Sequence, residues 1–171
     1  RLMRRLAEGY VELESSAFRD KVEAEVKAQQ LRKKNPKQAA KYKKEAAKAV
    51  KVIKVARKNA IKYYKALKKS YPKWCQFPNA QEGAQGCMDE VLYYLAYEYE
   101  QAGQLDEARK VYLELTENWK KSRFVPNAYL AFGELFFQDA QGDPSKWPIA
   151  ANFYKEVLKY PAPDNKLWGY A

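Results

Sequence analysis

The sequence has no histidine, and it has only two cysteines among its 171 residues. Histidine is the commonest general base and the commonest metal ligand in proteins, so its absence disfavours most hydrolases and metalloenzymes. Two cysteines alone cannot complete a zinc site, and their spacing is not the Cys-x-x-Cys of redox proteins. No serine, cysteine or glycine-rich arrangement indicates nucleophilic or phosphate chemistry. We therefore expect no metal, no cofactor and no catalytic activity.

Long apolar runs are also absent. No stretch of about 18 apolar residues occurs, so we expect no membrane-spanning helix. The chain begins at Arg1 without an apolar signal-peptide core and ends at Ala171 without a helix-stop residue, so we expect both ends to belong to a longer protein. The hydrophobic content of 47% is enough for a buried core.

The net charge of +11 is unevenly distributed along the chain. Residues 1–72 carry 22 basic and 7 acidic side chains, whereas residues 73–171 carry 10 basic and 14 acidic ones. Between Lys37 and Lys69, 13 basic residues accompany a single acid, Glu45. Such a bias attracts acidic proteins, nucleic acids or anionic lipids. The sequence thus predicts two electrostatically different parts.

Two long helices are predicted in the first part, because apolar residues recur three or four positions apart on either side of Asn35 and Pro36. Asparagine can cap a helix, and proline suits its first turn. Each helix of roughly 34 residues would be about 50 Å long, and the short connection favours an antiparallel hairpin. The residues of its basic tip would be Arg32, Lys33, Lys34, Asn35, Pro36 and Lys37.

Four shorter helices are predicted beyond an irregular stretch at residues 73–86. They span roughly residues 89–102, 105–119, 126–140 and 147–160. Turn signals separate or end them at Gly103, Ser122, 142–145 and Pro161. No segment alternates with period two for long enough to require a strand. The predicted fold class is therefore all-α.

A repeated spacing of large and small residues runs through the shorter helices. Its first copy comprises Leu92, Leu95, Ala96, Tyr99, Gly103, Ala108, Tyr112 and Leu115, and its second comprises Tyr129, Phe132, Gly133, Phe136, Ala150, Tyr154 and Val157. Both copies resemble the tetratricopeptide repeat (TPR), a helix-turn-helix of 34 residues, although the second is five residues longer around Asp143. The resemblance implies a solenoid of antiparallel helix pairs.

The first 72 residues resemble the same repeat with both helices lengthened. The matching positions are Met3, Leu6, Ala7 and Tyr10 in the first helix, and Ala60, Tyr64, Leu67 and Pro72 in the second. In an antiparallel pair the numbers of facing residues have a constant sum, which is 70 for Met3 with Leu67, Leu6 with Tyr64 and Tyr10 with Ala60. Half of this sum is 35, the position of the predicted turn. The same test places the other two turns at Gly103–Gln104 and at Asp143.

The predicted organisation has three parts. Residues 1–72 form an extended basic hairpin, residues 73–88 a connector with both cysteines, and residues 89–171 two TPR-like repeats and the start of another. The chain resembles long TPR proteins of Gram-negative cell envelopes, especially deltaproteobacterial and myxobacterial ones, which organise envelope or gliding-motility complexes. This resemblance implies a non-catalytic scaffold for protein-protein interactions.

TPR arrays bind protein segments on a concave face formed by their first helices. The family's groove positions fall on Glu90, Tyr93, Tyr97, Glu100, Gln101, Asn127, Leu130, Glu134, Phe137 and Gln138. The resemblance thus implies an aromatic and acidic groove for a peptide with basic or apolar side chains. For Tyr93 and Phe137, the alternative is packing against the next repeat.

A stripe of lysines lies opposite the apolar face of the second long helix. This basic stripe comprises Lys41, Lys44, Lys48, Lys51, Lys58, Lys62, Lys65 and Lys69. It could be a solvated face, a contact for an acidic protein or an anionic envelope surface, or a nucleic-acid site. Nucleic acid is the least favoured, because Tyr42 and Tyr64 fall on the packing face and Arg57 is the only arginine between residues 37 and 69. Polyanion binding by this hairpin is the alternative to the scaffold function.

Cys75 and Cys87 both lie in the connector. A disulfide between them is favoured, and in the chain-entropy model it would stabilise the fold by about 3 kcal/mol. Disulfides persist in oxidising compartments, so the pair favours a periplasmic or envelope-associated location. The alternative is two reduced thiols in a cytoplasmic protein.

Overall fold

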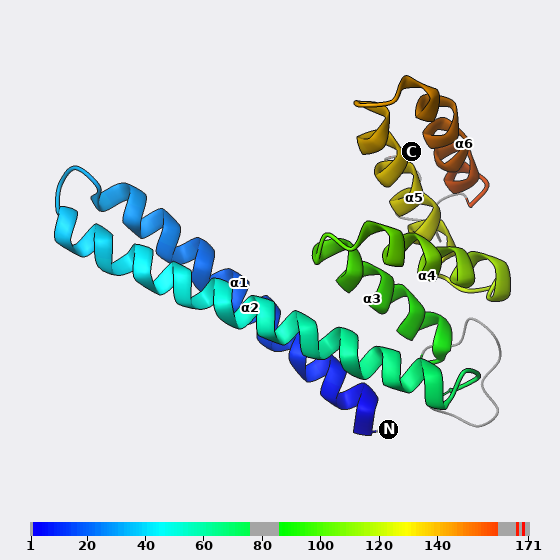
Figure 1. Cartoon of the computed structure of the whole chain (residues 1–171), viewed down its shortest axis with the longest axis horizontal. Coiled ribbons are helices and arrows are strands. Elements are labelled where there is room, and N and C mark those ends of the chain that lie inside the picture. Colours follow the sequence, from blue (N-terminus) through cyan, green and yellow to red (C-terminus); the bar gives the residue numbers. More distant parts are fainter. Residues whose placement is uncertain (1, 76–85, 161–166, 168, 170–171) are drawn as a thin grey trace. The chain divides into compact units, whose positions relative to one another are not determined.

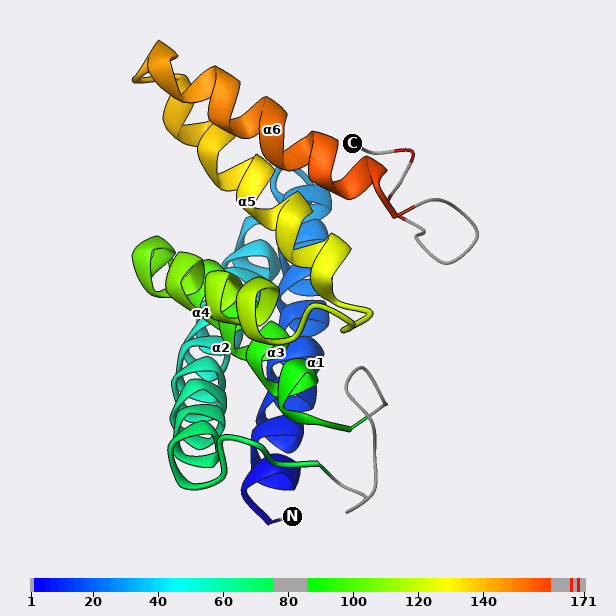
Figure 2. The same ribbon diagram turned by 90° about the vertical axis from the view of Figure 1, so that its right-hand side faces the viewer.

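The fold is all-helical in the part of the chain that the structure describes. The structure is a computed structural model, and it describes residues 2–75, 86–160, 167 and 169 (Figures 1 and 2). Most of the predicted connector and of the predicted start of a further repeat lies outside these residues. The helices are α1 (Leu2–Leu31), α2 (Pro36–Ser70), α3 (Met88–Gln101), α4 (Leu105–Asn118), α5 (Val125–Ala140), η1 (Pro144–Lys146) and α6 (Trp147–Leu158). The prediction of an all-α fold is confirmed.

The chain forms two compact units, Arg1–Leu67 and Lys68–Ala171. The first unit contains α1 and nearly all of α2, and the second contains the four shorter helices. We call them the hairpin and the array.

The two long helices of the hairpin lie side by side in both views (Figures 1 and 2). The backbone N–H of Gln38 donates to Oδ1 of Asn35 at 3.1 Å, and Pro36 is the first residue of α2. Asn35 therefore caps α2, as the sequence predicted. The preceding helix ends at Leu31, and Arg32 to Lys34 form the turn, within the predicted tip.

Contacts across the hairpin agree with the predicted register. The rings of Tyr10 and Tyr63 stack with centroids 5.8 Å apart, and Nε of Arg57 donates to Oε1 of Glu14 at 3.0 Å. Near the tip, Nζ of Lys27 lies 5.6 Å from the ring centroid of Tyr42. Each of these pairs lies within three positions of the predicted one. The two helices are thus paired along their length.

Alanine dominates the buried face of the hairpin. The buried residues of α1 are Ala7, Ala17, Ala24 and Ala28, and those of α2 are Ala39, Ala46, Ala49, Ile53, Ala56, Ala60, Tyr64 and Leu67. The larger three of these all lie in the second half of α2. Burial of an alanine methyl group removes little apolar area from water, so the tip half of the hairpin gains little hydrophobic stabilisation from its own core.

The array consists of two helix pairs, α3 with α4 and α5 with α6, and α4 also packs against α5. Gly103 has a φ of +73° in the turn between α3 and α4, a conformation that glycine adopts without a steric penalty. Asp143 precedes η1 and accepts a hydrogen bond from the backbone N–H of Ser145 at 3.1 Å. Both residues lie where the sequence predicted turns.

Large side chains fill the interior of the array. Leu92, Leu95, Tyr112 and Leu115 are among its fully buried residues. Gly133 allows α5 and α6 to approach closely, because a Cβ at this position would lie 2.5 Å from Cε1 of Tyr154. Helix ends differ slightly from the prediction, since α4 ends at Asn118 and α6 at Leu158.

Candidate binding surfaces

The predicted groove residues lie on two helices of the array, five on α3 and five on α5. They differ in how far they are exposed. Tyr97, Gln101, Glu134, Phe137 and Gln138 are exposed, Tyr93, Glu100, Asn127 and Leu130 are half-buried, and Glu90 is buried. Nine of the ten thus have surface that a ligand could contact.

Glu90 has a structural role in the fold. The backbone N–H of Gly86 donates to its Oε2 at 2.7 Å, and Nη2 of Arg123 lies 3.9 Å from its Oε1. It is the third residue of α3, where a carboxylate stabilises the free N–H groups of the helix start. Glu90 is therefore not presented to a ligand. Its place in the first helical turn was the sequence signal for this role.

Tyr93 packs against the start of the next helix pair, in agreement with the alternative prediction for this residue. Its ring stacks on that of Phe124 with centroids 4.7 Å apart, and its hydroxyl is hydrogen-bonded to the side chain of Asn127. Burial raises the pKa of Tyr93, and the bond to Asn127 opposes this shift. Sequence reasoning missed Phe124, which lies just before α5 and completes this aromatic contact.

Glu100 of α3 and Glu134 of α5 form an acidic pair on this face. The Tyr112 hydroxyl donates to Oε2 of Glu100 at 3.1 Å, and the Tyr154 hydroxyl donates to Oε1 of Glu134 at 3.0 Å. Burial raises the pKa of Glu100, the bond from Tyr112 opposes this, and the charge of Glu134 raises it further. The two carboxylates are thus close enough to repel each other, and each is oriented by a tyrosine of the following helix.

The two tyrosines respond to the same carboxylates. Burial, together with the bond to Glu134 and its charge, raises the pKa of Tyr154 to about 12. Burial and then the charge of Glu100 likewise raise the pKa of Tyr112. Both phenols therefore remain protonated at neutral pH and remain hydrogen-bond donors to the carboxylates.

Exposed aromatic rings flank the acidic pair. Tyr97 lies one helical turn before Glu100 on α3, and Phe137 lies three residues after Glu134 on α5. The Phe137 ring meets the Trp147 ring edge to face, with centroids 4.9 Å apart. We call the surface formed by Tyr97, Glu100, Glu134 and Phe137 the acidic-aromatic face. It combines negative charge with apolar area, which suits a basic or apolar side chain.

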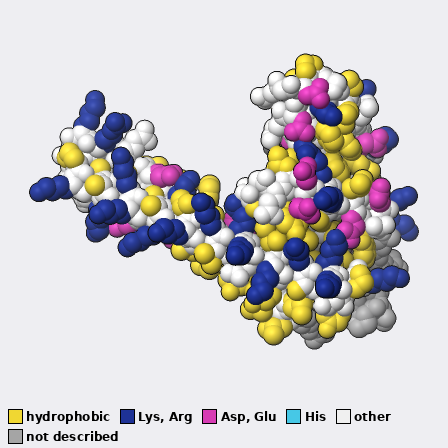
Figure 3. Space-filling model, viewed as in Figure 1, with side chains coloured by type: hydrophobic (Ala, Val, Ile, Leu, Met, Phe, Trp, Pro, Cys, Tyr) yellow, Lys and Arg dark blue, Asp and Glu magenta, His cyan; other side chains and the backbone are white. Residues whose placement is uncertain are grey.

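All eight lysines of the basic stripe are exposed. Lys41 lies 4.0 Å from Glu45, and Lys62 lies over the Tyr63 ring, 5.5 Å from its centroid. Among the residues that the structure describes, no acidic side chain pairs with Lys62 or with the other six, which are Lys44, Lys48, Lys51, Lys58, Lys65 and Lys69. Figure 3 shows many dark-blue basic side chains along the hairpin.

The acidic residues of α1 do not neutralise this stripe. Three of them pair within their own helix, namely Glu8 with Arg4, Glu23 with Lys27 and Glu25 with Lys21. Glu14 pairs with Arg57 of α2, which is not part of the stripe. The positive charge of the hairpin is therefore concentrated on α2.

A disulfide joins Cys75 to Cys87, which are also the two partners of an isolated antiparallel bridge. The pairing is the one that the sequence favoured. It closes a loop whose inner residues, 76–85, lie outside the described part of the chain.

Neither a metal site nor a membrane-spanning helix is found among the described residues. No group of three or more cysteine, aspartate or glutamate side chains that could hold a metal ion occurs among the described residues. None of the described helices is long and apolar enough to cross a membrane. Comparison with known protein families, with curated proteins and with solved structures gives no match for this chain.

Proposed function

We propose that the chain is a non-catalytic, TPR-like scaffold that binds a protein segment on the acidic-aromatic face of its array. The pairing of two carboxylates from α3 and α5 between exposed aromatic rings is the observation that carries this proposal. A segment with a lysine or arginine among apolar residues fits best, because its charge would meet Glu100 and Glu134 while its apolar side chains cover Tyr97 and Phe137.

The resemblance to envelope TPR proteins also supports a proposal about the cellular location of the scaffold. We place the scaffold in a bacterial cell-envelope complex, such as a gliding-motility complex, with a periplasmic location; a cytoplasmic location is the alternative. The disulfide supports an oxidising compartment. A thiol assay on unreduced protein purified from its native host tests this location. Two titratable thiols would contradict it.

The main experiment compares peptide binding by charge variants of the array. A fluorescent peptide of alternating lysine and leucine is titrated with the wild type and with Glu100→Lys/Glu134→Lys, and anisotropy is recorded. The double variant should bind about tenfold more weakly or worse, a loss of about 1.4 kcal/mol. The matched control, Glu107→Lys/Glu117→Lys, changes the charge equally on exposed positions of α4 and should bind like the wild type. Equal affinity of both variants would refute the proposed site.

The second candidate function is polyanion binding by the basic stripe, at an anionic membrane surface, on an acidic protein or, least favoured, on nucleic acid. It is supported by the seven stripe lysines, all except Lys41, that have no acidic partner among the residues that the structure describes. Reversal of Lys48, Lys51, Lys58 and Lys62 to glutamate should abolish binding to anionic vesicles or duplex DNA. Wild-type binding to either polyanion should weaken steeply with added salt. If charge reversal leaves binding unchanged, this second function fails.

A further inference from the structure

The hairpin places small side chains inside and several of its bulky apolar side chains outside. All four buried residues of α1 are alanines, whereas Phe18 is 54% exposed and Val22 is 41% exposed. On α2, Val55 is 60% exposed. A helix pair that existed only to project into water would be more stable with this pattern reversed. Figure 3 shows yellow apolar side chains between the basic ones along the hairpin.

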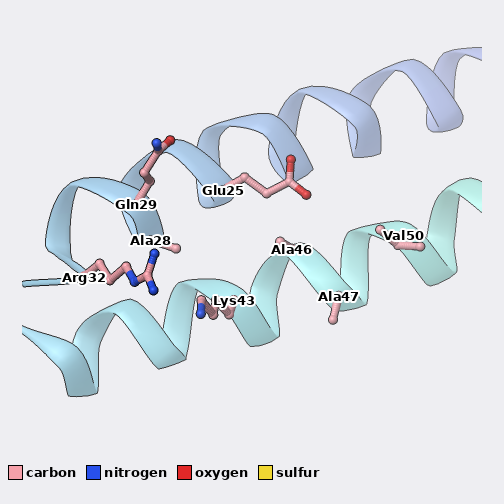
Figure 4. A pocket seen from close by; sticks show the side chains of 8 residues that line it. All are labelled: Glu25, Ala28, Gln29, Arg32, Lys43, Ala46, Ala47 and Val50. Carbon is pink, nitrogen blue, oxygen red and sulfur yellow. The ribbon is translucent and has the colours of Figure 1, made fainter.

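A groove runs between the two helices near the tip (Figure 4). Its volume is about 530 Å³, and its lining residues are Glu25, Ala28, Gln29, Arg32, Lys43, Ala46, Ala47 and Val50. Ala28 and Ala46 are buried at the helix interface, and their small side chains leave the space between α1 and α2 open. The groove therefore follows from the alanine core of this half of the hairpin.

Helical spacing extends the two walls of the groove toward the middle of the hairpin. Phe18 and Val22 precede Glu25 and Gln29 at intervals of four and three residues, which places them on the same side of α1. On α2, Lys54 follows Val50 by four residues and continues the other wall. Fourteen residues separate Phe18 from Arg32 along α1, about 21 Å at 1.5 Å per residue. This length fits about four turns of another helix.

The rim of the groove is basic. Lys43 lines its α2 side and Arg32 its tip end. Lys54 continues the α2 side beyond Val50 by helical spacing. Glu25 is its acidic lining residue, and its carboxylate already lies 3.5 Å from Nζ of Lys21. A ligand for this groove therefore needs apolar side chains for the floor and acidic side chains along the edge facing α2.

We propose that the groove binds an acidic amphipathic helix of a partner protein, which lies along the hairpin and completes a three-helix bundle. The apolar anchors of the partner helix contact Phe18, Val22 and Val50, and its glutamates or aspartates meet Lys43 and Lys54. This surface is separate from the acidic-aromatic face of the array, and the proposal does not depend on it.

A second copy of the chain suits the groove less well. Helix α2 carries 13 basic residues and one acidic residue. A shared bundle would bring two such helices together at interaxial distances of about 8–10 Å, which is close to the screening length of about 8 Å at physiological salt. Repulsion between the copies would thus remain, whereas an acidic helix is attracted.

Labelled synthetic helices titrated into the whole chain test the proposal. The probe is a peptide of about 21 residues with leucines at heptad a and d positions and glutamates beside them. A second peptide keeps the glutamates but has serines for leucines, and a third keeps the leucines but has lysines for glutamates. Fluorescence anisotropy at physiological salt should show binding of the first peptide, and about tenfold weaker binding or worse for the other two.

Two valines of α2 provide a matched pair of variants. Val50→Glu puts a carboxylate into the groove, whereas Val55→Glu puts the same group on the exposed face of the same helix. The first variant should lower affinity for the acidic peptide about tenfold, and the second should change it less than about threefold. Phe18→Ser removes the largest wall residue without adding charge and should weaken binding as well, so the test does not depend on how well Val50→Glu folds.

Several results would overturn the proposal. These are no binding of the acidic peptide, equal binding of the serine peptide, or equal effects of Val50→Glu and Val55→Glu. A wild-type dimer that Val50→Glu converts to a monomer in analytical ultracentrifugation would also overturn it, since the groove would then be an interface between copies.

Discussion

Residues 1–67 and residues 68–171 both consist of antiparallel helices, but they bury different side chains. The hairpin core is mostly alanine, with Ile53, Tyr64 and Leu67 as its larger members. The array core contains leucines, tyrosines and Phe132, together with small residues such as Ala108 and Gly133. Apolar burial scales with side-chain area, so the array gains more stability from each buried residue.

The two units also differ in how their charged side chains are paired. In the array, most ion pairs join neighbouring residues or neighbouring helices, as Arg109 does with Asp106 and Asp139. In α2, like-charged lysines follow one another at helical spacing, which costs a few tenths of a kcal/mol for each pair. Many charges of the array are therefore paired, whereas α2 of the hairpin retains repulsion between like charges.

Truncation of the array core should have the largest effect on stability. Leu115 of α4 is 0% exposed, so Leu115→Ala should lower the free energy of unfolding by about 2–5 kcal/mol. All four tryptophans lie in residues 74–168, and the fluorescence of an unfolding titration in urea therefore reports on the array alone. Leu113→Ala, at a 48% exposed position of the same helix, is the control and should change the midpoint little. Similar losses for both variants would contradict a leucine-filled core.

Much of this fold could be predicted from the sequence. Turn residues such as Asn35, Gly103 and Asp143 mark helix ends by local chemistry, and the apolar period marks the faces between them. The role of Glu90 was harder to predict, because a carboxylate in the first turn of a helix can cap the helix or face a ligand, and the sequence does not separate these roles.

The candidate sites were less predictable than the helices. The position of Glu100 on α3 indicated a surface residue, but its bond from Tyr112 and its repulsion by Glu134 depend on how three helices pack. The groove between α1 and α2 was missed, although the alanines that form it stood on the predicted packing face. Small side chains mark a helix interface in a sequence, but the space they leave depends on the separation of the helices.

A second prediction concerns bulky residues inside and outside the hairpin. Ile53 is 8% exposed, so Ile53→Ala should destabilise the hairpin by about 2 kcal/mol or more. Phe18→Ala removes a larger side chain from a 54% exposed position and should cost less than about 1 kcal/mol. Far-UV circular dichroism during thermal unfolding follows the helices of both units and measures these losses. The unfolding transition seen by tryptophan fluorescence should match that of the wild type, because all four tryptophans lie in the array. If Phe18→Ala costs as much as Ile53→Ala, then Phe18 is already covered in the free chain and the contrast between the two units is weaker than we infer.

The smallest predicted effect tests whether the array, too, loses stability at its acidic-aromatic face. Burial and Glu134 raise the pKa of Glu100, so the folded chain holds this proton more tightly than the unfolded chain does. The contribution of Glu100 to stability is therefore greatest below its ordinary pKa and is lost as pH rises through the raised value. In Glu100→Gln, the amide oxygen can still accept the Tyr112 hydrogen bond but cannot ionise. Urea titrations followed by tryptophan fluorescence should give equal free energies of unfolding for variant and wild type near pH 4, and a slightly higher one for the variant at pH 7.

The control Glu117→Gln, at an exposed position, should have the same free energy of unfolding as the wild type at both pH values. If the difference in free energy of unfolding between Glu100→Gln and the wild type is the same at both pH values, ionisation of Glu100 does not destabilise the array. The loss of stability at the surface would then be confined to the hairpin.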